Sequence, residues 1–544
     1  MALKKNQIIP LTIDSLSNDG NGVGRFEGMA VFVPFTAKGD KADVRIVKVC
    51  KNYAFGIVEH LRYPGAGRAE PSCPIFGKCG GCQFQHLTYE AELEAKEQFV
   101  RDAMNRLGGI SYPVSSILPS PLPLRYRNKV QYPLIQDADG VVRAGFYANR
   151  SHRVIPCDDC ILQPTLLNAI AQTVCDLLTR YHIPIYHETT HSGLVRHLYL
   201  RHAITTNRVL VCLVCNGNRL PHADAFCSEL TALHPEICSI VLNVNRQQTN
   251  VITGNECISL WGEKFLADQM ADVPVQLGPL SFYQVNTLGA NQLYAVVQNF
   301  AALQSSDLLL DLYCGAGTIG LSMASRCQKL IGVEIIPEAV ESARQNAARM
   351  GISHAEFFCE DAGQAARRLA SQNLRPNVIV LDPPRKGCDA TTLEAVLKMA
   401  PQRIVMVSCN VSTAARDVRY LCEHGYVVHA IQPVDMFPRT KHVETVCLLS
   451  KLNAKQHIEV DIHMDELDLT DAEKKATYSE IKEYVLEHTG LKVSSLYIAQ
   501  VKQKCGIIER ENYNKPKSDD AKQPQCPPDK EKAIKEALKH FGMI

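Results

Sequence analysis

The hydrophobic residues of the first 62 positions fall in short runs that are separated by turn signals. Apolar-rich stretches such as MAVFVPF and ADVRIVKV alternate with NDGNGVG, KGD and KN. Short runs bounded by glycine, asparagine and aspartate are typical of β-strands joined by tight turns. The pattern predicts a small OB-like β-barrel at residues 1–62, a shape that often binds RNA but that also occurs as a generic barrel without a ligand.

The hydrophobic pattern changes from about residue 290, where strongly apolar strands alternate with amphipathic helices. The strands read DLLLDLYC, LIGVEI, AEFFCE, NVIVLDPP and RIVMVSCN. Parallel strands that are covered by helices on both faces have this composition. We therefore predict a doubly wound, Rossmann-like α/β domain at residues 286–452, in which ligands bind at the carboxyl ends of the strands.

The region between these two units predicts a central α+β domain at residues 63–285. It opens with a loop rich in proline, glycine and cysteine, continues with a helix at about 88–107, and then mixes strands with a few helices. The segments RYRNKVQYP and LVRHLYLRH alternate basic with apolar residues. Such strands could lay a basic face on RNA phosphates, although a solvated sheet face fits the pattern equally well.

The last part of the chain, residues 453–544, predicts a helical extension with a linker. Thr470 and Glu473 have the spacing of a capping box before a helix that places Tyr478, Ile481 and Val485 on one face. The segment NKPKSDDAKQPQCPPDK is typical of a linker, and a short helix follows it. The whole chain is therefore expected to be a multidomain α/β protein.

Composition narrows the class of protein. The 544 residues are 46% hydrophobic and 21% charged, with a net charge of +1, so a nucleic-acid partner would have to bind local basic patches. No apolar run reaches the length of a membrane span, and the amino terminus lacks the apolar core of a secretion signal. We expect a cytoplasmic protein without membrane attachment, and no feature indicates an obligate protein partner.

A glycine-containing turn follows the first strand of the predicted Rossmann-like domain. It reads DLYCGAGTIG and contains the G-x-G-x-x-G spacing of a dinucleotide site. The next strands end at Glu334, at Glu360-Asp361 and at Asp382-Pro-Pro384, and acidic groups there can meet a ribose or an adenine. The turn suits either NAD or S-adenosylmethionine (SAM), and the later strand ends favour SAM modestly. The alternative is a series of surface acids that cap strand ends.

Cysteines occur at two kinds of chemically useful position among the 21 in the chain. Cys409 follows a strand in VSCN, where it would face the cofactor crevice as a candidate nucleophile; Cys314 and Cys388 also lie near strand ends. Cys73, Cys79 and Cys82 are close together, and Cys157 and Cys160 lie downstream. A fourth thiolate would complete a site for zinc or for an iron–sulfur cluster, and the spacing alone does not choose the metal.

Taken together, these motifs resemble the bacterial RNA uracil-carbon-5 methyltransferases. The resemblance is closest to the 23S ribosomal RNA enzymes that carry a TRAM domain and a [4Fe–4S] cluster, and it runs from about residue 5 to 450. It rests on CPIFGKCGGCQFQH, YRNKVQYP, SFYQVNT, DLYCGAGTIGL, VLDPPRKG, VSCNVSTAARD and DMFPRTKHVETV. Thr318 departs from some relatives, which have asparagine there, and the tail beyond about 455 falls outside the pattern.

The resemblance implies a role for each candidate residue. It implies SAM as cofactor, Cys409 as nucleophile and Glu444 as the base; without it, Glu444 would be interpreted as a surface glutamate paired with Lys441 or His442. Cys160 is preferred to Cys157 as the fourth cluster ligand because the family's fourth cysteine precedes an Ile/Leu-Gln pair. The implied SAM contacts are Gln284, Tyr313, Glu334, Asp361 and Asp382, and the implied ligands of the [4Fe–4S] cluster, with zinc as the less favoured metal, are Cys73, Cys79, Cys82 and Cys160.

Three rival functions were weighed against the residues. An amino-group methyltransferase would have an aromatic residue after Asp-Pro-Pro, where this chain has Arg385, and a DNA cytosine-carbon-5 enzyme would have a Pro-Cys pair, where this chain has Ser408 before Cys409. A non-catalytic RNA-binding or assembly factor would have lost Cys409 and Glu444. The expected substrate is RNA, with 23S ribosomal RNA favoured and transfer RNA as the alternative, and Arg125, Arg127 and Lys129 are candidates for holding it.

Overall fold

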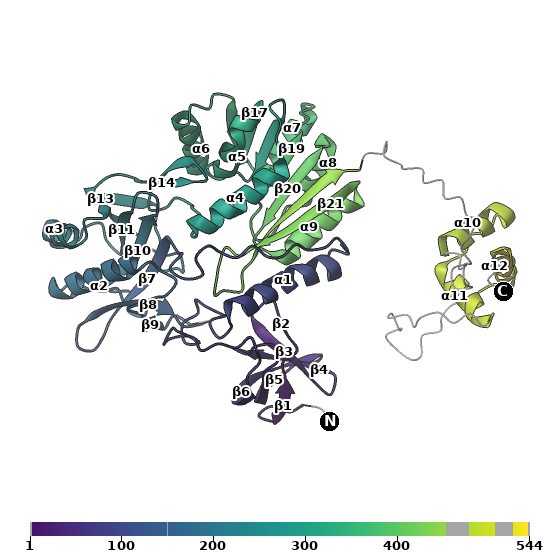
Figure 1. The fold of residues 1–544 in the computed structure, drawn as a ribbon, viewed down its shortest axis with the longest axis horizontal. Helices are drawn as coiled ribbons and strands as arrows, with labels where there is room; N and C mark the ends of the chain where they lie inside the picture. Colours follow the sequence, from purple (N-terminus) through teal and green to yellow (C-terminus); the bar gives the residue numbers. More distant parts are fainter. Residues whose placement is uncertain (1–2, 150, 453–477, 506–525, 542–544) are drawn as a thin grey trace. The chain divides into compact units, whose positions relative to one another are not determined.

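The computed structural model describes residues 3–149, 151–452, 478–505 and 526–541. The chain divides into two compact units, residues 1–453 and 454–544, which are described separately (Figure 1). The predicted capping box of Thr470 and Glu473 lies outside the described residues, as does most of the predicted linker.

The amino-terminal strands form one strongly curved sheet in the order β1-β5-β6-β4-β3-β2. Side chains alternate between buried and outward-facing along these strands, and the buried set includes Ile9, Val31, Val33, Val44 and Ile46. This confirms the predicted β-unit. The strands are β1 (Ile8–Thr12), β2 (Ser15–Leu16), β3 (Asn21–Phe26), β4 (Met29–Pro34), β5 (Lys41–Val49) and β6 (Tyr53–Tyr63).

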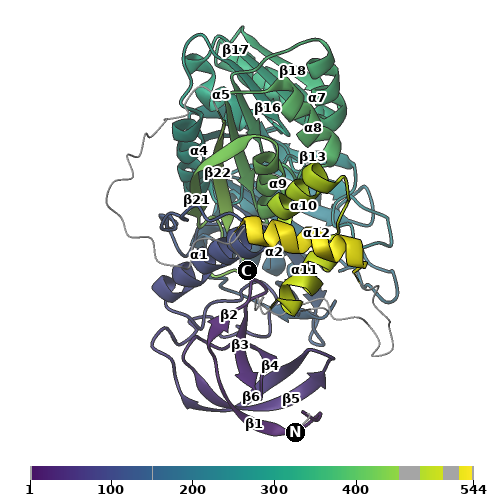
Figure 2. The ribbon, with the colours of Figure 1, turned by 90° about the vertical axis from the view of Figure 1, so that its right-hand side faces the viewer.

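Helix α1 (Tyr89–Arg106) follows the cysteine-rich loop and begins at the predicted place. The side chain of Thr88 caps it by accepting a hydrogen bond from the backbone N–H of Ala91. Its residue Phe99 packs with Phe84 beneath the barrel, whereas Met104 belongs to a core shared with the carboxy-terminal sheet. Helix α1 therefore connects the barrel with that sheet (Figure 2).

The central sheet has the strand order β13-β12-β11-β10-β7-β8-β9, in which β11 and β12 are parallel and the other neighbours antiparallel. Helices α2 (Thr165–Arg180) and α3 (Ala223–Leu233) pack on one face, and the hairpin of β14 (Leu266–Met270) and β15 (Val273–Leu277) contributes to the core on the other. The strands are β7 (Lys129–Gln136), β8 (Val142–Tyr147), β9 (Val154–Pro156), β10 (Val195–Ala203), β11 (Arg208–Cys215), β12 (Ile237–Val244) and β13 (Glu256–Gly262).

Strand β10 corrects one expectation about basic residues. The segment LVRHLYLRH was predicted to offer a basic face to RNA or to solvent, but every residue of β10 is buried. Arg196 donates to the carbonyl oxygens of Asn245 and Gln247, and Arg201 donates to the Tyr199 hydroxyl and the Ser281 carbonyl oxygen. The strand lies inside the sheet and both of its faces are covered, so these cations satisfy interior carbonyl and hydroxyl groups instead.

The carboxy-terminal sheet of the first unit confirms the predicted doubly wound domain. Its order is β18-β17-β16-β19-β20-β22-β21, and β22 runs antiparallel to both of its neighbours. In β19 (Val378–Leu381), Val378 and Val380 enter one core whereas Ile379 and Leu381 enter another. The other strands are β16 (Leu308–Leu312), β17 (Lys329–Glu334), β18 (Ala355–Cys359), β20 (Arg403–Ser408), β21 (Tyr426–Val434) and β22 (Glu444–Lys451).

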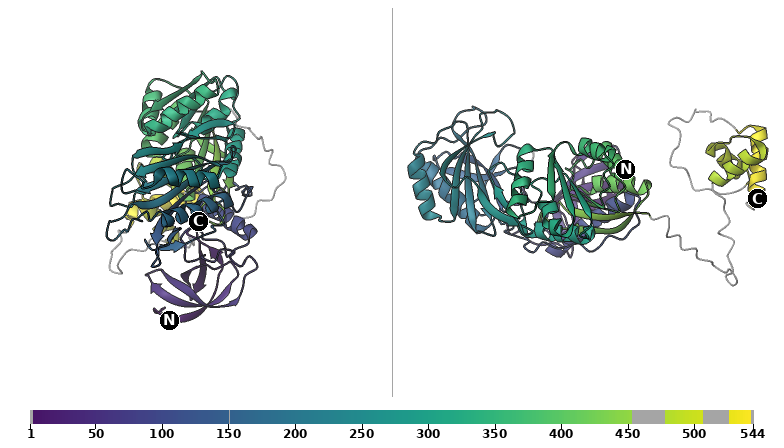
Figure 3. Two further views of the ribbon diagram at one scale, coloured as in Figure 1. Left: turned by 90° about the vertical axis from the view of Figure 1, so that its left-hand side faces the viewer. Right: turned by 90° about the horizontal axis from the view of Figure 1, so that it is seen from above.

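Helices cover both faces of this sheet (Figure 3). Those that share the first core are α4 (Thr287–Ala301), α5 (Thr318–Met323) and α6 (Pro337–Arg349). Those that share the second core with α1 are α7 (Ala362–Ser371), α8 (Ala390–Met399) and α9 (Val411–Glu423). With both faces buried, the carboxyl ends of the strands are the place where polar groups can gather.

The second unit contains α10 (Tyr478–Thr489), α11 (Ser495–Lys504) and α12 (Pro528–His540). These helices share a core of their own that includes Ile481, Val485, Ile498, Val501 and Ile534. The predicted helical character of the extension is therefore confirmed where the structure describes it. Within the described ranges, no helix has both the length and the apolar character that crossing a membrane requires.

Candidate active site and cysteine cavity

Cys409 and Glu444 meet at the carboxyl end of β20. Ser408, the last residue of β20, pairs with Thr445 of β22. Cys409 follows Ser408 and Glu444 precedes Thr445, so the two residues lie directly beyond the last pair of this ladder. Cys409 is partly exposed and Glu444 is buried. The structure thus brings the predicted nucleophile and the predicted base together, although 35 positions separate them in the sequence.

The charges of this site influence one another. Burial, and then the Glu444 carboxylate, raises the pKa of the Cys409 thiol to about 11, while Arg385 opposes that rise. Burial, and then Asp382, raises the pKa of Glu444 to about 8, and Arg385 again opposes the rise. Burial alone raises the pKa of Asp382 to about 7. Perturbed pKa values of this size in neighbouring groups are typical of functional sites.

Arg385 is a site residue that the sequence analysis used only to exclude a rival enzyme class. Its Nη2 donates to Nδ1 of His442 at 3.0 Å. Burial, and then Arg385, lowers the pKa of His442 to about 4, so the ring is neutral and can accept this bond. The signal that could have identified Arg385 is its place directly after the strand-end Asp-Pro-Pro.

The alternative interpretation of Glu444 as a surface glutamate is wrong. The Nζ atom of Lys441 lies 2.8 Å from Oδ1 of Asp19 in the barrel, and His442 bonds to Arg385. Glu444 is instead buried at the start of β22, with a side chain that belongs to the interior of the site.

The glycine turn after β16 forms an open cradle. Tyr313, Gly315 and Gly317 all have positive φ angles, of 65°, 54° and 76°. A side chain at Gly315 would project into open space, since no atom lies within 4 Å of a Cβ there. Oε2 of Glu334 accepts from the Gly315 N–H at 3.0 Å, and Oε1 accepts from Ile335 and Ile336. The turn and the end of β17 therefore hold each other and leave room for a ligand.

The other predicted cofactor residues lie at the same edge or beside it. Oδ1 of Asp361 caps α7 by accepting from the Gly363 and Gln364 N–H groups, a structural duty the sequence analysis had kept as an alternative. The carbonyl oxygen of Gln284, in the loop before α4, accepts from Nδ2 of Asn128 at 2.8 Å. The Tyr313 hydroxyl lies 3.3 Å from Oγ1 of Thr392.

Asp311 was quoted with the turn motif but not predicted as a site residue. Its Oδ2 accepts from the Gly320 N–H at 3.0 Å, while Oδ1 is buried without a hydrogen-bond partner among the described residues. Burial raises the pKa of this carboxyl to about 8. A carboxyl group in this environment holds the start of α5 against β16, so it helps to shape the cradle.

Cys314 and Cys388 are poorly placed to act as alternative nucleophiles. Cys314 is 7% exposed and Cys388 is 5% exposed. Burial raises the pKa of the Cys314 thiol well above its usual range and that of Cys388 to about 12. Both side chains pack in the hydrophobic cores.

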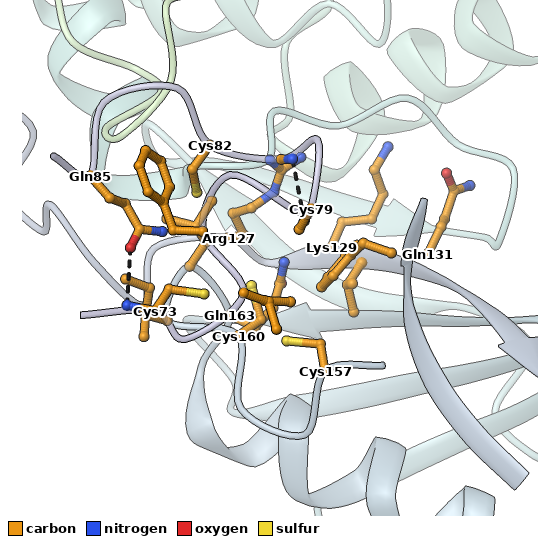
Figure 4. Close-up of a pocket in the computed structure, with 17 residues that line it drawn as sticks. Cys73, Cys79, Cys82, Gln85, Arg127, Lys129, Gln131, Cys157, Cys160 and Gln163 are labelled. Carbon is orange, nitrogen blue, oxygen red and sulfur yellow. Dashed lines mark hydrogen bonds between the residues drawn. The ribbon is translucent and has the colours of Figure 1, made fainter. Parts of the chain in front are cut away.

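A cavity of about 250 Å³ lies where the cysteine-rich loop meets the central sheet. Figure 4 shows cysteine side chains from two segments around it, with Arg127 and Lys129 on its wall. Among the described residues, no three His, Cys, Asp or Glu side chains are arranged to hold a single metal ion. Five thiols line this cavity. They are Cys73, Cys79, Cys82, Cys157 and Cys160.

Cys157 and Cys160 differ in chemical character although both line the cavity. A hydrogen bond from Cys157, and then backbone N–H groups of Leu162 and Gln163, lower the pKa of Cys160 to about 7. The same bond, together with burial, raises the pKa of Cys157 strongly. The hydrogen bond between the two thiols thus acts on their pKa values in opposite directions.

Three cations lie close together beside the cavity. Lys129 pairs with Arg201 across β7 and β10, and burial, then Arg201 and Arg127, lower the pKa of Lys129 to about 8. In the part of the chain that the structure describes, neither the Arg127 side chain nor the Lys129 side chain has a hydrogen-bond or ion-pair partner, and Nη1 of Arg201 is also unsatisfied. Arg125, in contrast, forms an ion pair with Asp159 at 2.5 Å.

Comparisons with known proteins extend over both the barrel and the rest of the first unit. Residues 88–452 match the tRNA (uracil-5-)-methyltransferase family and residues 2–58 match the TRAM domain. An uncharacterized RNA methyltransferase of Clostridium tetani is 39% identical over 454 residues, which cover 84% of this chain and 98% of that protein. Another, from Halalkalibacterium halodurans, is 40% identical over 452 residues, or 83% and 98% of the two chains.

One solved structure is similar over most of the chain. It is the Pyrococcus abyssi tRNA (uracil-54, C5)-methyltransferase in complex with S-adenosyl-L-homocysteine. It superposes with a TM-score of 0.66 at 27% sequence identity, and the match covers 81% of this chain and 99% of that one.

Proposed function

The chain belongs to the tRNA (uracil-5-)-methyltransferase family and is a SAM-dependent RNA uracil-C5 methyltransferase, and we propose that it methylates one specific uridine of 23S ribosomal RNA through a covalent bond to Cys409. The observation that carries the covalent mechanism is the ladder between β20 and β22, because Cys409 and Glu444 lie at its end, where each influences or is influenced by the other and by Asp382. This arrangement joins a nucleophile and a base on one substrate ring.

Each group has a defined task, since carbon-5 of uracil is a weak nucleophile. The Cys409 thiolate adds to carbon-6, and the electron pair of the 5,6 double bond moves toward the carbonyl oxygen as an enolate, which makes carbon-5 nucleophilic. Bound SAM supplies the methyl group that carbon-5 acquires. The Glu444 carboxylate then takes the carbon-5 proton, the 5,6 double bond forms again and the sulfur–carbon-6 bond breaks, which returns the thiolate.

Arg385 supports both ionised groups in this scheme. Burial disfavours the thiolate of Cys409 and the carboxylate of Glu444, and Arg385 acts against that effect on each of them. Its bond to the neutral His442 ring holds the guanidinium near the site without neutralising it. We infer that Arg385 keeps enough of both groups in the reactive form.

The proposed SAM-binding residues come from successive strand ends. The open cradle at Gly315 gives the backbone access to a ligand, and Glu334 is already fixed beside it by three N–H groups. Gln284 belongs to a loop that Asn128 fixes through the peptide carbonyl. The proposed set remains Gln284, Tyr313, Glu334, Asp361 and Asp382.

We also propose that the cysteine cavity holds a [4Fe–4S] cluster. In such a cluster each thiolate binds a different iron, so the ligands surround a volume, whereas a zinc ion draws its ligands to one centre. The lining of one cavity by five cysteines supports the first case. The proposed ligands are Cys73, Cys79, Cys82 and Cys160. Methyl transfer moves no net electrons, so the cluster's role is structural or in RNA binding.

RNA would contact the cations beside this cavity. Among the described residues, the side chains of Arg127 and Lys129 have no ion-pair partner, so an RNA phosphate could supply one. Arg125 is the weaker candidate because Asp159 already neutralises it. The target base must leave its stack to reach Cys409, and backbone contacts to the surrounding loop would hold the RNA while it does so. Such a reaction would take place in the cytoplasm.

Transfer RNA is the alternative substrate, and the similar Pyrococcus abyssi enzyme supports it by its own substrate. The test is to purify ribosomal and transfer RNA from cells that lack this protein and to incubate each with the enzyme and SAM, with Cys409→Ala as the control. Methylation of one uridine in 23S RNA, mapped by mass spectrometry, is the expected result. Methylation of transfer RNA alone would replace the ribosomal assignment with the alternative.

A further inference from the structure

A loop at residues 435–443, which we call the base loop, joins β21 to β22 and ends at Glu444. Glu444 is the first residue of β22, so the base loop leads directly into it. Polar side chains from other parts of the chain hold the base loop, and the most buried of them come from α1.

Lys96 of α1 is at the centre of these contacts. Its side chain is fully buried. The Nζ atom donates to Oε1 of Glu92 at 2.7 Å, to Oδ1 of Asp435 at 2.7 Å and to the carbonyl oxygen of Phe437 at 3.1 Å. All three donor positions of the ammonium are thus used, and two of them go to the base loop.

The neighbours of Lys96 on α1 extend the same network. The Oε1 atom of Glu92 also accepts from the backbone N–H of Arg439 at 2.7 Å. The hydroxyl of Tyr89 donates to Oδ2 of Asp435 at 2.8 Å. One helix therefore holds both the start and the middle of the base loop.

Residues outside α1 hold the remaining backbone groups of the loop. The N–H groups of Gln83 and Phe84 donate to the carbonyl oxygen of Arg439 at 2.9 and 3.1 Å. Nδ2 of Asn286 donates to the carbonyl oxygen of Met436 at 3.0 Å. The base loop is therefore fixed on several sides, and Lys96 and Glu92 are the charged groups that α1 brings to it.

Stability alone is a poor reason for this arrangement. Moving an ammonium and two carboxylates out of water costs about as much as their attraction returns, so packed apolar side chains of the same volume would stabilise the protein as well. What the ions add is geometry, because a buried donor with three fixed acceptors permits one loop conformation.

We propose that Lys96 is a positioning residue that holds Glu444 in the place where it can take the carbon-5 proton. This inference rests on the proposed role of Glu444 as the base. It predicts a specific defect: without Lys96, Cys409 can still add to uracil and the methyl group can still be accepted, but removal of the carbon-5 proton becomes slow.

The test measures the full-length Lys96→Met variant on two RNA substrates. This substitution keeps the volume of the side chain and removes its charge. On RNA that contains 5-fluorouridine, the covalent adduct forms without any proton removal. We therefore expect Lys96→Met to form this adduct at the same rate as the unchanged protein. On ordinary RNA we expect turnover to fall about tenfold to a hundredfold, as misplacement of a catalytic group does, and a methylated covalent complex should accumulate.

Two further variants make the result decisive. Met104→Ala opens a hole in α1 away from the network and controls for loss of stability; it should lower both rates by the same factor. Glu444→Gln should stall on ordinary RNA. If it does not, the role of Glu444 fails and the positioning role fails with it. If Glu444→Gln stalls but Lys96→Met loses both rates equally or neither, only the positioning role is overturned.

Should Lys96→Met fail to fold, Lys96→Arg serves in its place. The guanidinium keeps the charge but is longer and planar, so it cannot put its donors at the same three acceptors. The expected result is the same split between the two substrates, smaller in size. Unchanged kinetics on both substrates in the folded Lys96→Arg protein would overturn the proposal.

Discussion

Cys409 and Glu444 occupy adjoining ends of β20 and β22 because β22 runs antiparallel to the rest of its sheet. The first residue of an antiparallel strand lies at the same edge as the last residue of its neighbour. A parallel β22 would have carried Glu444 to the opposite edge of the sheet. The reversal of one strand thus places the carboxyl group of Glu444 at the edge where the parallel strands and the glycine turn end.

Replacing Cys409 by alanine should abolish covalent attachment to RNA. We expect no denaturation-resistant adduct with 5-fluorouridine RNA and a fall in methylation of at least about 10³-fold, as loss of a catalytic nucleophile typically causes. SAM binding should remain, because the cradle at Gly315 is formed by other strands. Gel electrophoresis under denaturing conditions measures the adduct. Cys314→Ala is the control and should form it; an adduct in Cys409→Ala would move the nucleophile elsewhere.

Replacing Glu444 by glutamine should stop the reaction after methyl transfer. The amide keeps the size of the side chain but cannot accept the carbon-5 proton, so turnover should fall by about 10²- to 10⁴-fold. A methylated covalent complex should accumulate on ordinary RNA, detectable as a shifted band that contains labelled methyl. The surface variant Glu423→Gln should behave as the unchanged protein. Loss of RNA binding without a stalled complex would indicate a substrate-holding role.

The rate of product release should depend on pH through Glu444. Burial, and then Asp382, raises its pKa to about 8, so at lower pH most molecules carry the protonated carboxyl, which cannot act as a base. Release in a single turnover should therefore rise about tenfold per pH unit below pH 8 and level off above it. Rapid-quench measurements at a series of pH values give this profile.

Arg385→Met should move the same profile to higher pH. Arg385 lowers the pKa of Glu444, so removing the cation raises that pKa and delays formation of the carboxylate. Adduct formation on 5-fluorouridine RNA reports Cys409 separately, and it should also require higher pH because Arg385 acts on that thiol too. A midpoint that stays in place or moves to lower pH would contradict the electrostatic role of Arg385.

The sequence was informative where the local pattern and the environment agree. The apolar runs that end at Glu334, Asp382 and Cys409 predicted buried parallel strands, and in a doubly wound sheet such ends share one edge. The strands and the edge were therefore predictable without contacts. Arg385 was harder to interpret, because a cation after a strand end is as often exposed to solvent as part of a site. Its distance to His442 and its effect on the pKa values of Cys409 and Glu444 decide for a place in the site.

Two features could not be predicted because they depend on distant parts of the chain. Strand β10 has the alternation of a half-exposed strand, yet α2 covers one of its faces and the hairpin of β14 and β15 covers the other. Lys96 lies 339 positions from Asp435, and nothing near either residue in the sequence marks a buried pair. Period-2 and period-3.6 patterns report which side of an element faces inward, but not what lies there.

The proposed cluster predicts colour and iron content. Protein purified without oxygen should be brown and contain about four irons per chain, the content of a cubane cluster. Cys79→Ser and Cys160→Ser should lose the iron, whereas Cys157→Ser should keep it and is the matched control. SAM binding, measured by calorimetry, should survive in all three variants. A colourless preparation with one zinc would replace the iron assignment, and iron that persists in Cys160→Ser but not in Cys157→Ser would exchange the fourth ligand.

The cations beside the cysteine cavity predict how RNA binding depends on salt and pH. If Lys129 contacts a phosphate, Lys129→Met should weaken RNA binding and reduce the slope of log affinity against log salt by about 0.7 to 0.9, the effect of one lost phosphate contact.

Burial and two neighbouring cations lower the pKa of Lys129 to about 8. The free protein therefore loses this charge as pH rises through that value, and RNA affinity should fall over the same range. Filter binding at several salt concentrations and pH values measures both effects. The control variant Lys398→Met, on the exposed side of α8, should leave the salt dependence and the pH dependence of RNA binding unchanged. An unaltered salt slope in Lys129→Met would show that the phosphate backbone lies elsewhere.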